Sequence, residues 1–324
     1  MSRMLYSASR WRPRGTGGLG HLLLALFGAI VFLSSASVAA QDLKIGLMPA
    51  VDSIPLLIAQ EQGFFEDEGI DVELRMFRNQ LYRETALQTN GIDGSVSDLI
   101  NAVYNWRNRT GVQVGSITDG HFALLTAADS GLTTIAKWNR RDSVAVGLLE
   151  NSIIYYVAER MLEAGGGKTE TIELVTTLQV PTRMEMVVAG QIEAALLPEP
   201  VTRIAEARGS NILLDSSVLE QTPGVLLFTE RARREKSEEI RALYRAYNRA
   251  VEAINADPDS FRSAIVRLGE FPPTVEKSMV IPTYERARRP TAVELSDVTD
   301  WMVEKGLIES RPSYSAVVAS GLLP

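Results

Sequence analysis

Four short apolar runs in this sequence each end at or near an acidic residue. Asp52 follows "LKIGLM", Asp98 closes "GSVSD", Glu150 follows "VAVGLL", and Glu199 follows "AALLP" and lies between two prolines. If these runs are strands of parallel sheets, the acids lie at the carboxyl ends of the strands, where such sheets bind ligands. Carboxylates accept hydrogen bonds and pair with cations, so the chemistry expected of this group is recognition of N–H donors.

Polar residues adjoin each acid and complete the predicted ligand-binding set. Its members are Asp52, Ser53, Ser95, Ser97, Asp98, Glu150, Asn151, Ser152, Tyr155 and Glu199. Each stretch also leads into a predicted loop or helix N-terminus, whose free N–H groups can bind small anions without basic side chains. No lysine or arginine lies within the four stretches, so we expect a cationic or donor-rich ligand, such as an amine or an aminopyrimidine.

Structural roles compete with ligand binding at several of these positions. Asp52 and Asp98 are residue types that cap helices, and Glu150 can be a surface residue beside a cap. Glu199 is the strongest ligand candidate, because Pro198 and Pro200 restrict the backbone on both sides of it. His121 is the one histidine after residue 40, and we expect it to be structural.

The elements that position these residues alternate between strands and helices. Strands are predicted at Leu43–Met48, Gly69–Phe77 and in "IDGSVS", with helices between them, and the same order recurs from Ser143. The second set contains a helix in "TRMEMVVAG" that a capping box, Thr182 with Glu185, is predicted to open. This order predicts an α/β protein with mainly parallel sheets, and no residue-level repeat is evident between the two halves.

The chain becomes mainly helical after residue 236. Apolar residues fall on one face of the stretch "SEEIRALYRAYNRAVEAINADP", which predicts a long helix whose tyrosines belong to the core. We therefore predict four regions: a signal peptide at 1–40, the first part of lobe 1 at 41–130, lobe 2 at 131–218, and a return to lobe 1 with C-terminal helices at 219–324.

The first forty residues have the composition of a cleavable secretory signal. Four arginines precede a twelve-residue apolar run, and small residues follow at Ser37–Ala40. Cleavage there changes the formal charge of the 324-residue chain from −7 to −11, which argues against nucleic acid as a partner. The sequence has no cysteine, hence no disulfide, thiol nucleophile or lipid attachment site. We expect a periplasmic, non-lipidated monomer.

Several motifs resemble one family of transport proteins. "LKIGLMPAVDSIPLLIAQEQGFFEDEGIDVEL", "NGIDGSVSDLINAV", "AGQIEAALLPEPVTRIAEARG" and "YRAYNRAVEAINADPDSF" are similar to segments of the ABC-importer substrate-binding proteins for nitrate, sulfonates, taurine and thiamine precursors. The resemblance covers Leu43 to the C-terminus. It implies a two-lobed type II periplasmic-binding fold, a small polar ligand held between the lobes by hinge closure, and delivery to an ABC permease.

The resemblance leaves the substrate open. The loop from Ser95 to Asp98 lacks the glycine and proline residues often found there in the family, so no substrate preference is carried over. We favour an amine or aminopyrimidine such as a thiamine precursor, with sulfonate, taurine or nitrate as alternatives. A biosynthetic enzyme on a similar fold, resembling a pyrimidine synthase or a dehydratase, and a ligand-sensing partner of a membrane receptor are the rival classes. We expect no catalytic residue, metal or cofactor.

Overall fold

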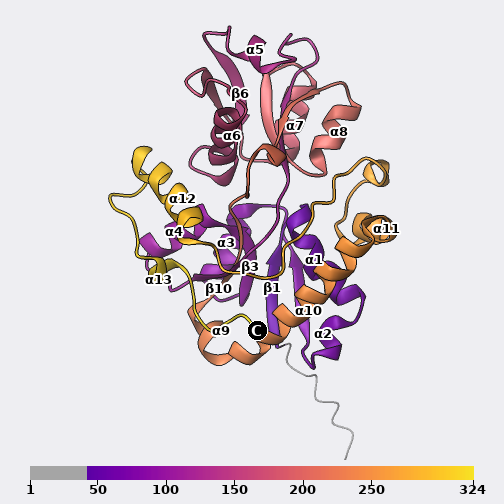
Figure 1. Ribbon diagram of the computed structural model, residues 1–324, viewed down its shortest axis with the longest axis vertical. Helices are drawn as coiled ribbons and strands as arrows, with labels where there is room; N and C mark the ends of the chain where they lie inside the picture. The colour runs from indigo at the N-terminus through magenta and orange to yellow at the C-terminus, as the bar shows by residue number, and fades with distance from the viewer. Residues whose placement is uncertain (1–41) are drawn as a thin grey trace, which may run out of the picture. The chain divides into compact units, whose positions relative to one another are not determined.

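Within residues 42–324, ten strands form two five-stranded sheets, and helices cover the faces of both (Figure 1). The computed structural model describes residues 42–324, and the predicted signal peptide lies outside this range. The prediction of a mixed α/β fold with two helix-flanked sheets is confirmed.

The two sheets have the same topology. The first has the order β2 (Val72–Met76), β1 (Leu43–Leu47), β3 (Gly94–Asp98), β10 (Gly224–Phe228), β4 (Gln113–Ile117). The second has the order β7 (Ile172–Thr176), β6 (Val144–Leu148), β8 (Ala194–Pro198), β5 (Phe122–Thr126), β9 (Asn211–Asp215). In each sheet the fourth strand runs antiparallel to both its neighbours and the other four run parallel to one another.

The strand order corrects one predicted boundary. β5 belongs to the second sheet, so the first change of sheet falls between Ile117 and Phe122 and not near residue 131. The chain returns to the first sheet at β10, after Asp215. The first strand after each crossing, β5 or β10, becomes the antiparallel fourth strand of the sheet that it enters. A short apolar run in the sequence does not show to which sheet a strand belongs.

Thirteen α-helices surround these sheets within the described residues. They are α1 (Ile54–Glu61), α2 (Phe64–Asp67), α3 (Gln80–Gln88), α4 (Leu99–Arg107), α5 (Ile135–Trp138), α6 (Ile153–Ala164), α7 (Val180–Val188), α8 (Val201–Ala207), α9 (Glu230–Glu235), α10 (Ser237–Ala256), α11 (Pro258–Leu268), α12 (Ala292–Glu304) and α13 (Tyr314–Val317). Short 3-10 turns occur at Val51–Ser53, Ser216–Val218 and Pro273–Val275. No helix in 42–324 combines the length and apolar character that a membrane crossing needs.

Helix packing follows the apolar stripes of the sequence. α10 lies against α1, α2 and α11 and buries Leu243, Tyr244, Tyr247 and Val251, which confirms that its tyrosines are core residues (Figure 1). α4, α12 and α13 pack together beside the first sheet, whereas α6 covers one part of the second sheet and α7 with α8 another.

The two lobes also repeat at the level of single residues, contrary to the prediction. A Cβ on Gly46 would lie 3.3 Å from Cγ of Arg83, and a Cβ on Gly147 would lie 3.0 Å from Cγ of Arg183. Both glycines therefore let an arginine stem pass close over the second strand of the sheet, β1 or β6. The equivalence extends to Asp93 and Glu193, which each accept a hydrogen bond from a backbone N–H at the start of that strand.

Candidate functional site

A cavity of about 430 Å³ receives the carboxyl ends of strands from both sheets. Its walls come from the loops after β1, β3, β6 and β8 and from the segments that open α3 and α7. The lining residues are Met48, Pro49, Ala50, Val51, Asp52, Arg78, Asn79, Gln80, Arg83, Ser97, Asp98, Gly120, His121, Phe122, Leu149, Ile153, Ile154, Leu178, Gln179, Val180, Pro181, Arg183, Pro198 and Val201. More than half of them are apolar, so the cavity suits a small organic molecule with a few charged or polar groups.

Asp52 presents a carboxylate whose oxygen Oδ1 is buried and has no hydrogen-bond partner among the described residues. The residue lies in the 3-10 turn that precedes α1 and does not cap that helix, whose N-cap is Ser53. Burial raises the pKa of Asp52 to about 6, although the positive charge of Arg83 opposes the rise. Asp52 is thus a free acceptor on the first wall of the cavity.

Asp98 also lines the cavity, but its carboxylate is occupied. It is the N-cap of α4, where Oδ1 accepts the backbone N–H of Asn101 at 2.9 Å and Oδ2 accepts the side-chain amide of Asn101 at 2.7 Å. Burial raises its pKa to about 6 as well. The capping role considered from the sequence is therefore present at Asp98 and absent at Asp52.

Two buried arginines face the same cavity, and the sequence reasoning missed both. Arg83 is 5% exposed and forms an ion pair of 2.9 Å with Glu84; its Nη2 also donates to Oγ of Ser97 at 3.1 Å. Ser97 in turn donates to Glu84 at 2.9 Å. The ion pair with Glu84 neutralises the guanidinium on the first wall, although Nε of Arg83 and Oε2 of Glu84 have no partner among the described residues.

Arg183, the equivalent residue of the second lobe, has no such partner. It is 1% exposed, and its Nη1 and Nη2 donate to the backbone oxygens of Leu196 at 2.9 Å and Thr177 at 3.2 Å. Its Nε has no acceptor, and no described carboxylate forms an ion pair with it. Met184 and Leu197 stand where Glu84 and Ser97 stand in the first lobe.

Burial lowers the pKa of Arg183 to about 10, which still leaves the guanidinium charged at neutral pH. A buried charge without a counter-ion is costly to maintain, so an anion in the cavity would find a preorganised partner.

The helix that carries Arg183 also begins earlier than predicted. α7 starts at Val180 after Gln179, which makes no side-chain cap, and Pro181 lies in the first turn. The predicted capping box of Thr182 and Glu185 is therefore wrong. The earlier start puts the arginine one turn into the helix, directly over β6.

Five predicted ligand residues, from three of the four stretches, lie outside the cavity lining. Ser53 donates to the oxygen of Met48, Ser95 donates to the oxygen of Val96, and Ser152 is the N-cap of α6. Glu150 and Asn151 are exposed beside that cap. The hydroxyl groups of Ser53 and Ser95 are thus taken up by backbone oxygens near the strand ends.

Tyr155 and Glu199, the remaining members of the predicted set, point elsewhere. Tyr155 packs edge-on against Trp301 of α12, with ring centroids 6.0 Å apart. Glu199 is fully buried, and its Oε1 accepts the backbone N–H of Val280 at 2.7 Å and Nε of Arg203 at 3.1 Å. The fixed carboxylate between two prolines thus secures the segment around Val280, and it is absent from the cavity lining.

His121 does line the cavity, at the start of the chain's first entry into the second lobe. Its Nδ1 lies 3.3 Å from Oγ of Ser216, and its Nε2 has no partner among the described residues. Burial lowers the pKa of His121, so the ring is neutral near pH 7. It offers one further polar atom without adding charge. Residues 42–324 contain no group of three or more acidic or histidine side chains arranged to hold a metal.

Comparison with known proteins identifies the family. The model of the NMT1-like family matches residues 37–269. No curated protein sequence matches the chain.

Solved structures share the architecture at low sequence identity. The aliphatic sulphonate binding protein SsuA from Escherichia coli matches with a TM-score of 0.71 and 16% identity, over 86% of this chain and 92% of that chain. SsuA from Xanthomonas axonopodis bound to MOPS matches with a TM-score of 0.70 and 16% identity, over 88% and 99%. The ligand-binding component of an ABC-type import system from Staphylococcus aureus, with zinc bound, gives 0.71 and 15%, over 87% and 98%.

These structures are binding components of transport systems. At sequence identities of 15% and 16%, the similarity establishes the fold of this chain and nothing more. Because the family model spans well over half of the sequence, this chain belongs to the NMT1-like family and has the two-lobed fold of ABC-importer substrate-binding proteins, as its motifs predicted.

Proposed function

We propose that this protein is the periplasmic solute-binding component of an ABC importer, and that its solute is a small organic molecule with an anionic group and an N–H donor. The solute enters the cavity between the lobes, the lobes close over it, and the closed protein delivers it to a permease. An aminosulfonate or an amino acid of similar size has this pattern of charges.

The opposite charges on the two walls carry this proposal. Asp52 on the first wall has a buried oxygen without a partner, and Arg183 on the second wall is a buried cation without a counter-ion. A zwitterion would satisfy both at once, with its ammonium toward Asp52 and its sulfonate or carboxylate toward Arg183. The SsuA structure with MOPS supports this assignment, because MOPS also carries a sulfonate and an amine.

The same two residues disfavour the other ligands considered from the sequence. An aminopyrimidine could pair with Asp52 but would leave Arg183 without an anion. Nitrate could pair with Arg183 but would leave Asp52 unsatisfied and a largely apolar cavity of about 430 Å³ unfilled. Zinc, which is bound to the Staphylococcus aureus protein, has no suitable cluster of ligands within residues 42–324.

Hinge closure fits the distribution of exposed apolar side chains. Leu81 and Tyr82 on α3 are 62% and 68% exposed, and Leu178 before α7 is 57% exposed. Leu178 itself lines the cavity, and Leu81 and Tyr82 directly follow Gln80, which also lines it. Closure of the lobes would bury them, and a ligand that contacts both walls would shift the population toward the closed state.

The rival classes predict different observations. A biosynthetic enzyme would convert its bound compound. The cavity wall, however, has no cysteine to act as a nucleophile, and its histidine has no carboxylate partner. A sensor would share the cavity but bind a receptor. Turnover of the bound compound would favour the first rival, and co-purification with a receptor in place of permease subunits would favour the second.

Thermal shifts of the purified protein, unfolded and refolded to remove any bound solute, test the proposal. The panel is taurine and β-alanine as zwitterions, ethanesulfonate and nitrate as anions, and ethylamine and an aminopyrimidine as donors. A ligand at about 100 times its dissociation constant stabilises by about 2.7 kcal/mol. We expect a zwitterion to give the largest shift and ethanesulfonate a smaller one. A shift with the aminopyrimidine alone would contradict the role assigned to Arg183.

A further inference from the structure

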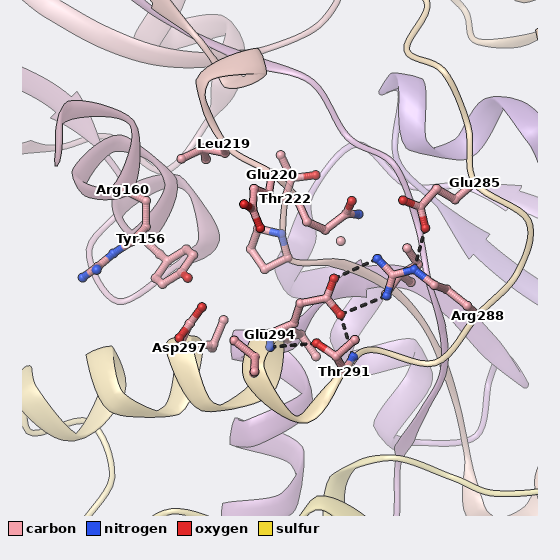
Figure 2. Close-up of a pocket in the computed structure, with 17 residues that line it drawn as sticks. Tyr156, Arg160, Leu219, Glu220, Thr222, Glu285, Arg288, Thr291, Glu294 and Asp297 are labelled. Atoms are coloured by element: carbon pink, nitrogen blue, oxygen red, sulfur yellow. Dashed lines mark hydrogen bonds and ion pairs between the residues drawn. The ribbon is translucent and has the colours of Figure 1, made fainter. Parts of the chain in front are cut away.

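A second pocket of about 540 Å³ lies beside the segment that returns the chain from the second sheet to the first (Figure 2). Tyr156 and Arg160 of α6 form one wall, residues 219–224 form the next, and the segment from Glu285 to Val298 forms the third. We call it the hinge pocket. It shares no lining residue with the cavity that contains Asp52 and Arg183.

The charged residues of the hinge pocket leave an excess of negative charge. Four carboxylates and two guanidinium groups line it. Arg288 is held by Glu285 at 2.5 Å and by both oxygens of Glu294, the closer at 2.8 Å, as the dashed lines in Figure 2 show. Arg160 pairs at 2.8 Å with Glu163, which lies outside the lining. Both cations are therefore already neutralised.

The other two carboxylates, Glu220 and Asp297, are exposed and form no ion pair with any described residue. Acidic side chains alone do not make a binding site, because water and salt screen them.

Tyr156 supplies evidence for a binding site that is independent of these carboxylates. The residue is 7% exposed, lines the pocket, and makes no hydrogen bond through its hydroxyl group to any residue in 42–324. Figure 2 shows Tyr156 and Asp297 facing each other across one end of the pocket. Burial, together with the charge of Asp297, raises the pKa of Tyr156 to about 12 against the opposing effect of Arg160, so the hydroxyl remains neutral. A hydroxyl group that reaches the pocket from an otherwise buried side chain, has no protein partner and lies opposite a free carboxylate is suited to share an N–H donor.

We propose that the hinge pocket binds a small aliphatic amine, with its ammonium group between the Tyr156 hydroxyl and the Asp297 carboxylate. The ammonium donates to both oxygens, and its charge offsets the acidic excess. Leu99, Pro223 and Val298 provide apolar surface for the carbon chain. Glu220, on the crossing segment, is available to a second amino group.

Calorimetric titration of the purified protein with 1,4-diaminobutane tests this site, with 1,4-butanediol as the uncharged analogue. We expect saturable binding of the diamine and none of the diol. Asp297→Asn should weaken the affinity by about tenfold, because it removes a charge-assisted hydrogen bond. Tyr156→Phe, which keeps the ring, should weaken it by a smaller factor.

Two control variants locate the binding. Glu170→Gln removes an exposed carboxylate away from the hinge pocket and should leave the affinity unchanged. Asp52→Asn alters the ligand cavity and should also leave it unchanged. Equal weakening by Glu170→Gln would mean nonspecific attraction to an acidic protein, and loss of binding in Asp52→Asn would place the amine in the other cavity. Either result, or no saturable binding at all, overturns the proposal of an amine site in the hinge pocket. The proposed transport function is tested separately, by the thermal shifts with zwitterions and ethanesulfonate.

Discussion

Replacement of Arg183 by methionine separates ligand binding from stability. The substitution keeps most of the side-chain length and removes the charge. For most buried ion pairs, removal of one partner costs about 3–5 kcal/mol, because the other charge stays buried and unpaired. Arg183 has no such partner among the described residues, so its removal leaves no charge behind.

The expected change in the free energy of unfolding is small. Burial lowers the pKa of Arg183 from 12.5 to about 10, which corresponds to a penalty of about 3 kcal/mol for keeping the charged form in the folded protein. The substitution relieves this penalty. It also deletes hydrogen bonds to the oxygens of Leu196 and Thr177, each worth about 1.5 kcal/mol when the donor is charged. The two effects nearly cancel, so Arg183→Met should alter stability by less than about 1.5 kcal/mol.

The equivalent arginine of the first lobe is the matched control. Arg83→Met leaves Glu84 buried without its cation, so we expect it to destabilise by about 3–5 kcal/mol. Urea denaturation of the ligand-free variants measures both changes, and calorimetric titration with the best ligand from the thermal-shift panel measures binding. Arg183→Met should fold normally and lose at least a hundredfold in affinity, about 2.7 kcal/mol. A variant that binds normally, or that is destabilised as strongly as Arg83→Met, would refute the description of Arg183 as a charge reserved for the ligand.

Four other substitutions test three separate parts of the structure. Because the pKa of Asp52 is raised from 3.8 to about 6, the folded protein holds its proton more tightly than the unfolded chain does, and the associated stability is full below pH 4 and is lost as the pH rises through 6. Asp52→Asn should therefore raise the free energy of unfolding, measured with urea, by up to about 3 kcal/mol at pH 7.5 and have little effect at pH 4; an equal effect at both pH values would count against this. Tyr82→Ser and Leu178→Ser should leave the stability of the open, ligand-free protein within about 0.5 kcal/mol but weaken ligand binding severalfold, unless closure leaves these side chains exposed. Glu199→Ala should cost about 2–4 kcal/mol in urea denaturation, because it strips the Val280 N–H of its acceptor, and it should bind ligand normally; lost binding would restore Glu199 as a ligand residue.

A cavity at the carboxyl ends of β1 and β3 was predictable because its position follows from strand order. Asp52, Ser97 and Asp98 stand at the carboxyl ends of β1 and β3, and the structure places all three in the lining. The roles of individual side chains were harder to predict. Glu199 is held by Val280, 81 residues later in the chain, and no local pattern indicates such a contact.

The arginines were missed because only four strand exits were considered. Arg83 and Arg183 come from the helices that follow β2 and β7, outside those stretches. One signal was present. The stretches "RETALQTNGID" and "RMEMVVAGQIE" have the same spacing from the arginine to an isoleucine and an acid. Arg83 precedes Ile92 and Asp93 as Arg183 precedes Ile192 and Glu193. That repeat has a physical basis, since each acid accepts a backbone N–H of β1 or β6 and each arginine stem passes over the glycine of the same strand.

The divergence within this repeat gives the sharpest test of the binding site. Glu84, which neutralises Arg83, corresponds to Met184, which lies next to Arg183 and is 9% exposed. A glutamate at this position should pair with Arg183 as Glu84 pairs with Arg83 and so compete with an anionic ligand. Met184→Glu should therefore reduce the affinity for an anion or zwitterion by at least tenfold, while Met184→Gln, of the same size but uncharged, should reduce it much less. Asp52 is untouched in both variants, so binding of a purely cationic ligand should not fall. If Met184→Glu and Met184→Gln weaken anion binding equally, the effect is one of packing, and the charge of Arg183 is not what selects the solute.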